Sequence, residues 1–442
     1  MKRFILLFSA LGLLASVLTA QIAPNVVRQK VAGLDVLIYR TGVKDIVTLK
    51  GSLPAGDSFA VDGNVAVPTL CGLLLDQGTT KQDKYAVAEK LESVGATLSF
   101  GTGLHLVEVN AKCLAQDLPL VIGLIAEQLR FPALSAEEFE KAKTQYAGSI
   151  QRSLESTDYR AEDAFSRAIY PAGHANRPAS PEEMLAAIAS ATLDQVKAFH
   201  AKHYGPAQFT LVLVGDVEAT AARGEIAQAF AGWTGGVTLP ATGPVGTTDT
   251  ANTVDVFMPD KTSVSIVLGQ ASGLRYSDPD SVPLRAATSI LGSDFTSRLV
   301  AQVRDTEGLT YGIYSQLDND SFGEGDWRIA ATFSPELLNQ GLESTQRHLR
   351  EWHSAGVTAN ELAQRKTNMV GRFKVSLATT DGLAGSLIKS VERGVGPEWL
   401  DLYPEKVKAL TPERVNSVIK QHLDPDKMIL IKAGTIPGAV GK

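Results

Sequence analysis

"TLDQVKAFHAKHYGPAQFTLVLVG" (192–215) and "TPERVNSVIKQHLDPDKMILIKAG" (411–434) are two stretches of one chain that align without a gap. Each begins with a threonine that can cap a helix, continues through a turn containing proline, and ends in an apolar run typical of a buried strand. The identical residues at matching positions include Val196 and Val415, His203 and His422, Pro206 and Pro425, and Gly215 and Gly434. The repeat predicts that the chain contains two copies of one structural unit.

A weaker second match supports the duplication and helps to divide the chain. "VPTL" at Val67 resembles "VPLR" at Val282, and "ESVGATLS" from Glu92 resembles "DTEGLTYG" from Asp305. Between the copies lies a stretch rich in Gly, Thr and Pro without periodicity, which predicts a linker at 232–253. A chain of 442 residues can bury two cores. We therefore expect two related α/β domains, at 21–231 and 254–442.

The N-terminus has the features of a secretory signal peptide. Lys2 and Arg3 precede an apolar stretch from Phe4 to Ala20, and polar residues follow from Gln21. This pattern predicts a signal peptide over 1–20 with cleavage after Ala20. The mature protein is expected to be periplasmic or secreted, without a membrane span.

Charge and cysteine content narrow the classes of partner. The formal net charge of -6 provides no basic field for nucleic acid or an anionic membrane. Two cysteines, Cys71 and Cys113, are too few for a disulfide scaffold. One disulfide and two buried thiols both remain open.

Among the individual residues, two histidines are the clearest candidates for metal ligands. His200 and His203 are spaced i, i+3 on one predicted helix, so they share a face. A zinc site needs a third ligand, and none is found nearby. His203 also recurs as His422 in the last turn of a helix, where an imidazole can bond to free carbonyl groups. An independent metallopeptidase that uses His200 and His203 is thus one alternative, and a structural role is the other.

A further candidate is the stretch "LGSDFTSRLVAQVRDTEGLTYGIYS", from Leu291 to Ser315. It predicts a Gly/Ser loop, an amphipathic helix carrying Arg298 and Arg304, a turn at Gly308, and a strand with Tyr311. Composition alone favours solvent-exposed side chains without a function, because surface Arg and Tyr are common.

Several motifs, in order, resemble the insulinase-like (pitrilysin) zinc peptidase family in its short two-domain form. The first half carries Gly78-Thr79 and "AEKLESVGATLSF", then "HANRP" at His174, "AFHAKHYGPAQ" at Ala198 and "VGDV" at Val214. The second half carries an S-R-L…R-x-x-x-G-L-x-Y signature, matched by Ser297, Arg298, Leu299, Arg304, Gly308, Leu309 and Tyr311. The resemblance covers nearly all of the mature chain. It implies an α+β fold of two homologous α/β-roll domains in tandem, each a mixed, largely antiparallel sheet with helices packed on one face, clam-like when dimeric.

The resemblance also implies that the zinc site of this chain is degenerate. The family's H-x-x-E-H motif, placed by its distance from Gly78-Thr79, falls on Thr69, Gly72 and Leu73. The family's distal glutamate ligand falls near Ser149, and its companion one heptad earlier falls near Ala142. None of these side chains can bind zinc or act as the general base. No metal cofactor is therefore expected in this chain.

The second half carries residues that match the family's substrate-binding Arg and Tyr, whereas the first half lacks the family's zinc ligands. In the family, an Arg and a Tyr with the spacing of Arg304 and Tyr311 hold the substrate backbone and stabilise the oxyanion. The resemblance therefore implies a zinc-free subunit, similar to the non-metal subunit of processing peptidases. Its expected partner is a homologous H-x-x-E-H chain that carries the zinc, and its expected substrates are unfolded peptides. The alternative is a catalytically inactive scaffold or peptide-binding protein of the same fold.

Overall fold

The computed structural model describes residues 21–60, 63–239 and 251–438. The predicted signal peptide at 1–20 lies outside these residues, and so does the part of the predicted linker from 240 to 250. Strand β7 begins at Asn252, inside the predicted linker. Within the described ranges, the helices are too short or too polar for any of them to span a bilayer.

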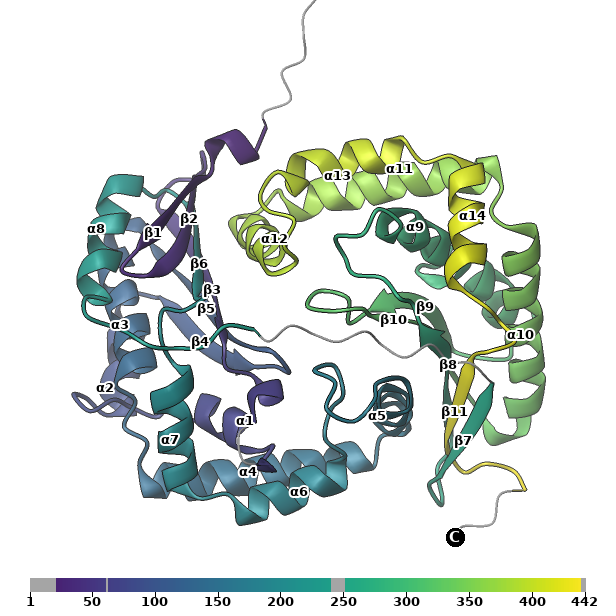
Figure 1. The fold of residues 1–442 in the computed structure, drawn as a ribbon, viewed down its shortest axis with the longest axis horizontal. Coiled ribbons are helices and arrows are strands. Elements are labelled where there is room, and N and C mark those ends of the chain that lie inside the picture. Colours follow the sequence, from purple (N-terminus) through teal and green to yellow (C-terminus); the bar gives the residue numbers. More distant parts are fainter. Residues whose placement is uncertain (1–20, 61–62, 240–250, 439–442) are drawn as a thin grey trace, which may run out of the picture.

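The first half forms a six-stranded sheet with the order β1-β2-β6-β3-β5-β4 (Figure 1). Its strands are β1 (Val27–Val31), β2 (Leu34–Arg40), β3 (Ile46–Pro54), β4 (Thr97–Thr102), β5 (Leu106–Leu114) and β6 (Thr210–Gly215). The helices of this half are α1 (Val67–Gly72), α2 (Lys84–Ser93), α3 (Leu118–Arg130), α4 (Ala136–Leu154), α5 (Thr157–Ile169), α6 (Pro181–Ser190), α7 (Leu193–His203) and α8 (Ala219–Ala229).

The second half forms a five-stranded sheet with the order β7-β11-β8-β10-β9. Its strands are β7 (Asn252–Phe257), β8 (Val264–Ala271), β9 (Gly312–Asp318), β10 (Asp326–Phe333) and β11 (Ile429–Gly434). The helices are α9 (Ser281–Gly292), α10 (Leu338–Ala355), α11 (Ala359–Ser376), α12 (Thr380–Glu392), α13 (Trp399–Lys408) and α14 (Pro412–His422), with a π-helical segment η5 (Val300–Thr306).

Five strands of the first sheet, all except β1, have the same topology as the second sheet, which confirms the duplication. In each, the strand of the aligned segment, β6 or β11, pairs in parallel with β2 or β7 and antiparallel with β3 or β8. Two further antiparallel pairings complete the set, β3 with β5 and β5 with β4 in the first sheet, and β8 with β10 and β10 with β9 in the second. The aligned segments form α7 with β6 and α14 with β11, and their threonine side chains cap the helices as expected.

Both repeated strands end in a glycine for the same steric reason. Gly215 has φ +146° and Gly434 has φ +141°. A Cβ at Gly215 would lie 2.0 Å from the carbonyl oxygen of Ile46, and one at Gly434 would lie 2.5 Å from that of Ser263. The close approach of the neighbouring chain excludes any side chain at these two positions.

Each sheet is covered on one face by helices of its own half and on the other by a helix of the opposite half. Helix α12 packs on β3 and β6, whereas α5 packs on β8 and β11 (Figure 1). In β6, Leu211 and Leu213 face the main core of the first half, while Val212 and Val214 pack with α12. The crossing helix explains why the whole of β6 is buried, as expected for a strand covered on both faces.

Equivalent hydroxyl pairs hold the crossing helices in place. The Oγ1 atoms of Thr48 on β3 and Thr380 on α12 lie 2.9 Å apart, and Thr157 Oγ1 on α5 lies 2.8 Å from Ser265 Oγ on β8. Thr157 and Thr380 are each the first residue of a helix of 13 residues. The starts of the two helices are thus a third repeat, Ser-Thr-Asp at 156–158 and Thr-Thr-Asp at 379–381. A match of three residues is too short to stand out in the sequence.

The open question about the cysteines is answered by this arrangement. Cys71 on α1 and Cys113 on β5 are both free and buried. Burial raises the pKa of each thiol to about 12. They therefore pack as small apolar side chains.

Candidate functional site

Three of the degenerate zinc-motif positions line one cavity of about 340 Å³. Thr69, Gly72 and Leu73 form its wall at α1 and just beyond it. The other walls come from strand β4, over Phe100–Thr102, and from α4, where Ala142 lies. The structure thus brings together the positions at which the resemblance places two ligands and a base.

The side chains at these positions serve packing and hydrogen bonding. Thr69 donates a hydrogen bond from Oγ1 to Asp57 Oδ1 at 2.8 Å. Burial raises the pKa of Asp57 to about 6, and the bond from Thr69 opposes that shift. Among the described residues, no group of three or more His, Cys, Asp or Glu side chains is placed to hold a metal ion.

Gly72 is a position at which the surrounding structure leaves no room for a side chain. A Cβ there would lie 1.9 Å from Thr102 Oγ1 and 3.2 Å from Thr102 Cβ on the neighbouring strand β4. A glutamate, which the zinc motif needs at this position, would therefore require Thr102 to move.

The contact between Gly72 and Thr102 leads to a stability prediction. Gly72→Ala is expected to lower the free energy of unfolding by about 1 kcal/mol, because overpacking of about 1–3 kcal/mol exceeds the gain in helix propensity of up to about 1 kcal/mol. In urea titrations, Thr102→Ala should restore most of that loss when combined with Gly72→Ala. Equal stability of Gly72→Ala and the unchanged protein would contradict the steric argument.

Lysines surround the one acidic side chain that α4 brings to this cavity. Lys84 Nζ lies 3.0 Å from Glu138 Oε2, and Lys141 Nζ lies 3.0 Å from Glu138 Oε1. Hydrogen bonds from Lys84 and then Lys141 lower the pKa of Glu138. The cavity lining thus carries two ammonium groups and two carboxylates, those of Glu138 and Asp76, and Glu138 is paired with both lysines. Neither lysine belongs to the motifs that resemble the family, so no sequence signal pointed to them.

Ser149, where the resemblance places the distal ligand, is not among the residues that line the cavity. It lies two turns further along α4 than Ala142. Its Oγ donates to the carbonyl oxygen of Tyr146 at 2.7 Å, within the same helix.

Arg304 and Tyr311 lie next to each other in the second half. Arg304 is near the end of the π-helical segment η5, the chain turns at Gly308 with φ +65°, and β9 begins directly after Tyr311. The Arg304 guanidinium carbon lies 5.5 Å from the centroid of the Tyr311 ring. Single π-helical turns occur frequently at functional sites. The spacing of seven residues thus brings the two side chains together, as expected.

A second aromatic ring, Phe295, lies against the same guanidinium group. Its centroid is 5.4 Å from the Arg304 guanidinium carbon, and its side chain is 77% exposed. Tyr311 is 91% exposed. Two aromatic faces favour the position of a cation by about 0.5–1 kcal/mol each at exposed sites. Phe295 belongs to the stretch singled out in the sequence, but no spacing rule relates it to Arg304.

Arg304 keeps most of its hydrogen-bonding capacity available to a ligand. Its Nε lies 3.8 Å from Asp305 Oδ1, which is beyond hydrogen-bond distance. The Arg304–Tyr311 pair belongs to the second half, and the cavity beside α1 is lined by residues of the first half only. The structure therefore presents two separate sites within one chain.

His200 and His203 have structural environments. His203 is buried, and its ring stacks on Phe199 with centroids 4.2 Å apart. Its two nitrogens have no hydrogen-bond partner among the described residues, so the predicted bond to a helix-end carbonyl is wrong for His203. His200 Nε2 lies 2.9 Å from the carbonyl oxygen of Leu129. His422 Nδ1 lies 3.2 Å from the carbonyl oxygen of Ser272, which follows strand β8, and its Nε2 lies 2.8 Å from Asp280 Oδ2, so the prediction of a helix-end carbonyl is wrong for His422 as well.

The chain thus consists of two similar α/β units, and Thr69, Gly72 and Leu73, to which the resemblance assigns the zinc motif, carry no side chain that binds zinc. Residues 190–369 match the family described as "Peptidase M16 inactive domain". The predicted resemblance to the insulinase-like (pitrilysin) peptidases is confirmed, and the matched part of the chain is similar to the inactive domain of that family.

Relatives of known sequence extend the similarity over most of the chain. An uncharacterized zinc protease of Streptomyces coelicolor is 22% identical over 358 residues, which cover 79% of this chain and 76% of the relative. The non-peptidase homolog YmxG of Helicobacter pylori is 20% identical and covers 84% of each chain.

Solved structures establish the same fold. A peptidase M16 inactive domain from Pseudomonas fluorescens superposes with a TM-score of 0.86 at 24% identity, over 95% of this chain and 99% of that one. The periplasmic protease PqqL from Escherichia coli gives 0.77 at 16% identity, over 93% of this chain and 46% of that one. The expected fold class is thereby confirmed.

Proposed function

We propose that this chain is the zinc-free subunit of a heterodimeric periplasmic metallopeptidase. A homologous partner with an intact H-x-x-E-H motif supplies the zinc ion, its ligands and the general base. This chain supplies Arg304 and Tyr311, which hold the substrate backbone and stabilise the oxyanion formed when water attacks the carbonyl. The predicted domains, 21–231 and 254–442, form one side of a chamber, and the signal peptide at 1–20 directs the chain to the periplasm.

The observation that carries the proposal is the convergence of Arg304, which is 29% exposed, with Tyr311, which is 91% exposed. Donors that stabilise an oxyanion must be preorganised and accessible to the substrate. The packing of the Arg304 guanidinium between two aromatic rings supports preorganisation. The exposure of Tyr311 supports access from outside the chain.

The sheet edges support a role in binding extended peptides. Strand β4 is the edge of the first sheet, and its residues Phe100–Thr102 line the cavity beside α1. Strand β9 is the edge of the second sheet and follows Tyr311. An edge strand offers unpaired backbone groups to which a peptide can add as a further strand.

Reconstitution tests the proposal directly. The mature chain is purified alone and is also mixed with an H-x-x-E-H homologue from the same genome. We expect zinc, measured by mass spectrometry, to copurify only with the homologue, and cleavage of an unfolded peptide to require both chains. Stoichiometric zinc together with peptidase activity in the chain alone would overturn the proposal.

A scaffold or peptide-binding protein without any catalytic contribution is the rival. The name of the Helicobacter pylori relative, a non-peptidase homolog, favours it. Formation of a stable complex that binds peptides and leaves them intact would support this rival over the proposed subunit.

A further inference from the structure

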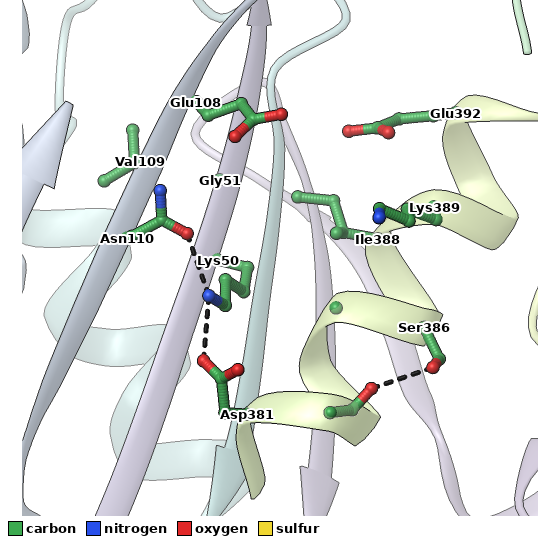
Figure 2. A pocket seen from close by; sticks show the side chains of 12 residues that line it. Lys50, Gly51, Glu108, Val109, Asn110, Asp381, Ser386, Ile388, Lys389 and Glu392 are labelled. Atoms are coloured by element: carbon green, nitrogen blue, oxygen red, sulfur yellow. Dashed lines mark hydrogen bonds and ion pairs between the residues drawn. The ribbon is translucent and has the colours of Figure 1, made fainter. Parts of the chain in front are cut away.

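A cavity of about 370 Å³ lies between the crossing helix α12 and strands β3 and β5 of the first sheet (Figure 2). At one end, Lys50 Nζ contacts Asn110 Oδ1 at 2.9 Å and Asp381 Oδ1 at 2.8 Å. Toward the other end, Glu108 on β5 and Glu392 on α12 extend toward each other from opposite walls. The cavity therefore has a neutralised end and an acidic end.

The internal repeat identifies the counterpart of this cavity in the second half. Thr48 pairs with Val214 on β6, and Ser265 pairs with Ala433 on β11, which is the aligned position. Four residues further along, Ser52 pairs with Glu108 in the first sheet and Gly269 pairs with Arg328 in the second. Glu108 and Arg328 thus occupy equivalent positions under the two crossing helices.

In the second half this position is occupied by a guanidinium group bound to two carboxylates. Arg328 is 3% exposed and lies over the Phe165 ring of α5. Its Nε donates to Asp326 Oδ1 at 2.6 Å, and Nη1 donates to Glu162 of α5. The crossing helix and the sheet therefore each provide one carboxylate for the same cation.

In the first half the two walls carry carboxylates, but the cation is missing. Counted from the first residue of each crossing helix, Glu162 corresponds to Gly385, and a Cβ at Gly385 would meet no atom within 4 Å. Gly385 lines the cavity and leaves it open. In the described part of the chain, neither Glu108 nor Glu392 forms an ion pair, so the cavity lacks the guanidinium that its counterpart contains.

The charges of the lining residues leave the cavity acidic. Lys50 and Asp381 neutralise each other. The remaining charged lining residues are Glu108, Glu392 and Lys389, so the net charge is -1 when both glutamates are ionised. Burial raises the pKa of Glu392 to about 7; a hydrogen bond with Ser52 and the charges of Lys389 and Arg393 lower it, and the charge of Glu108 raises it. A bound cation would offset the cost of burying the ionised carboxylate of Glu392.

We propose that this cavity is a binding site for a guanidinium group, between Glu108 of the sheet and Glu392 of the crossing helix. The ligand is free arginine or an arginine side chain of a peptide, and in the second case the inference rests on the proposed function. A volume of about 370 Å³ is in the range of small-molecule sites. A planar guanidinium can bond to carboxylates on two sides, as Arg328 does.

Calorimetric titration of the mature chain alone tests the site. The probes are free L-arginine and acetyl-Ala-Ala-Arg-Ala-Ala-amide, each compared with its citrulline analogue, which keeps the shape and lacks the charge. We expect one or both arginine probes to bind at least about tenfold more tightly than the analogue. Binding of free L-arginine identifies the amino acid as a ligand, and binding of the peptide alone identifies a peptide side chain.

Variants of the lining residues locate the binding. Glu108→Gln combined with Glu392→Gln should weaken arginine binding by about tenfold or more. Gly385→Arg should abolish it by placing a guanidinium in the cavity, whereas the matched control Gly385→Ala should bind as the unchanged chain does. Affinity should rise from about pH 6 to about pH 8, as Glu392 ionises around its pKa of about 7.

Three outcomes would overturn the inference: equal binding of arginine and citrulline probes, unchanged affinity in the double glutamine variant, or full binding by Gly385→Arg. The titration involves neither a partner chain nor cleavage. Failure of the reconstituted peptidase would therefore leave the result for free arginine unaffected, and failure of the titration would leave the proposed role of Arg304 and Tyr311 unaffected.

Discussion

Replacing Arg304 by alanine is expected to lower peptide cleavage by the reconstituted pair by about 10²–10³-fold, with Tyr311→Phe lowering it to a similar extent. Both changes remove a hydrogen-bond donor at the point where negative charge develops, so kcat should fall. The peptide Kd, measured with a zinc-free partner, should change much less. Initial rates of cleavage of a fluorogenic unfolded peptide provide the measurement.

Matched controls separate this effect from a general loss of structure. Arg350→Ala removes an exposed arginine on α10, whose Nε lies 3.4 Å from Asp426, and Tyr85→Phe removes an exposed hydroxyl on α2. Both controls should retain full activity. Unchanged cleavage with Arg304→Ala and Tyr311→Phe together would rule out the proposed contribution of this chain and favour the scaffold alternative.

Asp326→Asn is expected to lower the free energy of unfolding by about 3 kcal/mol, because the buried Arg328 loses its fully buried partner and keeps only Glu162. Asp326 is fully buried and accepts hydrogen bonds from Tyr170 Oη at 2.6 Å, Asn319 Nδ2 at 2.8 Å and Arg328 Nε at 2.6 Å. An asparagine at this position turns one acceptor oxygen into a donor that faces another donor. Urea unfolding followed by circular dichroism gives the free energy.

The control for this prediction is the same substitution in an exposed ion pair. Asp426 pairs with Arg350 at 3.4 Å, and both side chains are more than half exposed. Asp426→Asn should change stability by less than about 1 kcal/mol. If the two variants were equally stable, the buried network would not be a main source of stability.

The aligned segments predicted the repeated part of the fold because its local signals agree. A capping threonine, a helical apolar pattern and a buried apolar run identified α7 with β6 and α14 with β11 without any knowledge of tertiary contacts. The glycines at 215 and 434 were visible as matched positions, but their steric cause depends on neighbouring strands.

Caps and apolar patterns could not predict that α5 and α12 each cover the sheet of the opposite half. Amphipathic helices such as α5 and α12 show which face is buried, but not which sheet they cover. Only the contacts of Thr157 with Ser265 and of Thr48 with Thr380 reveal that each helix lies on the opposite sheet. The equivalence of Glu108 and Arg328 depends on strand register and was likewise beyond local patterns.

The sequence pointed to the motif residues of the candidate site, but not to the side chains that surround them. Motif spacing assigned Thr69, Gly72 and Leu73 to the zinc motif, and that assignment stays a prediction. The structure places these three residues on one cavity wall, and Arg304 next to Tyr311. Phe295 and the lysines beside Glu138 were missed, because contacts between distant or irregular segments leave no periodic signal in the sequence.

The crossing of α5 and α12 gives the chain the topology of a swapped dimer whose two protomers have been fused. Each sheet obtains the apolar cover of one face from the other copy, so neither copy is complete by itself. Hydrolysis of the chain between the copies would therefore leave two fragments that stay associated, and expression of either copy alone would leave one face of its sheet exposed to water. The joining segment keeps the copies in one polypeptide, whereas the exchanged helices make them one folding unit.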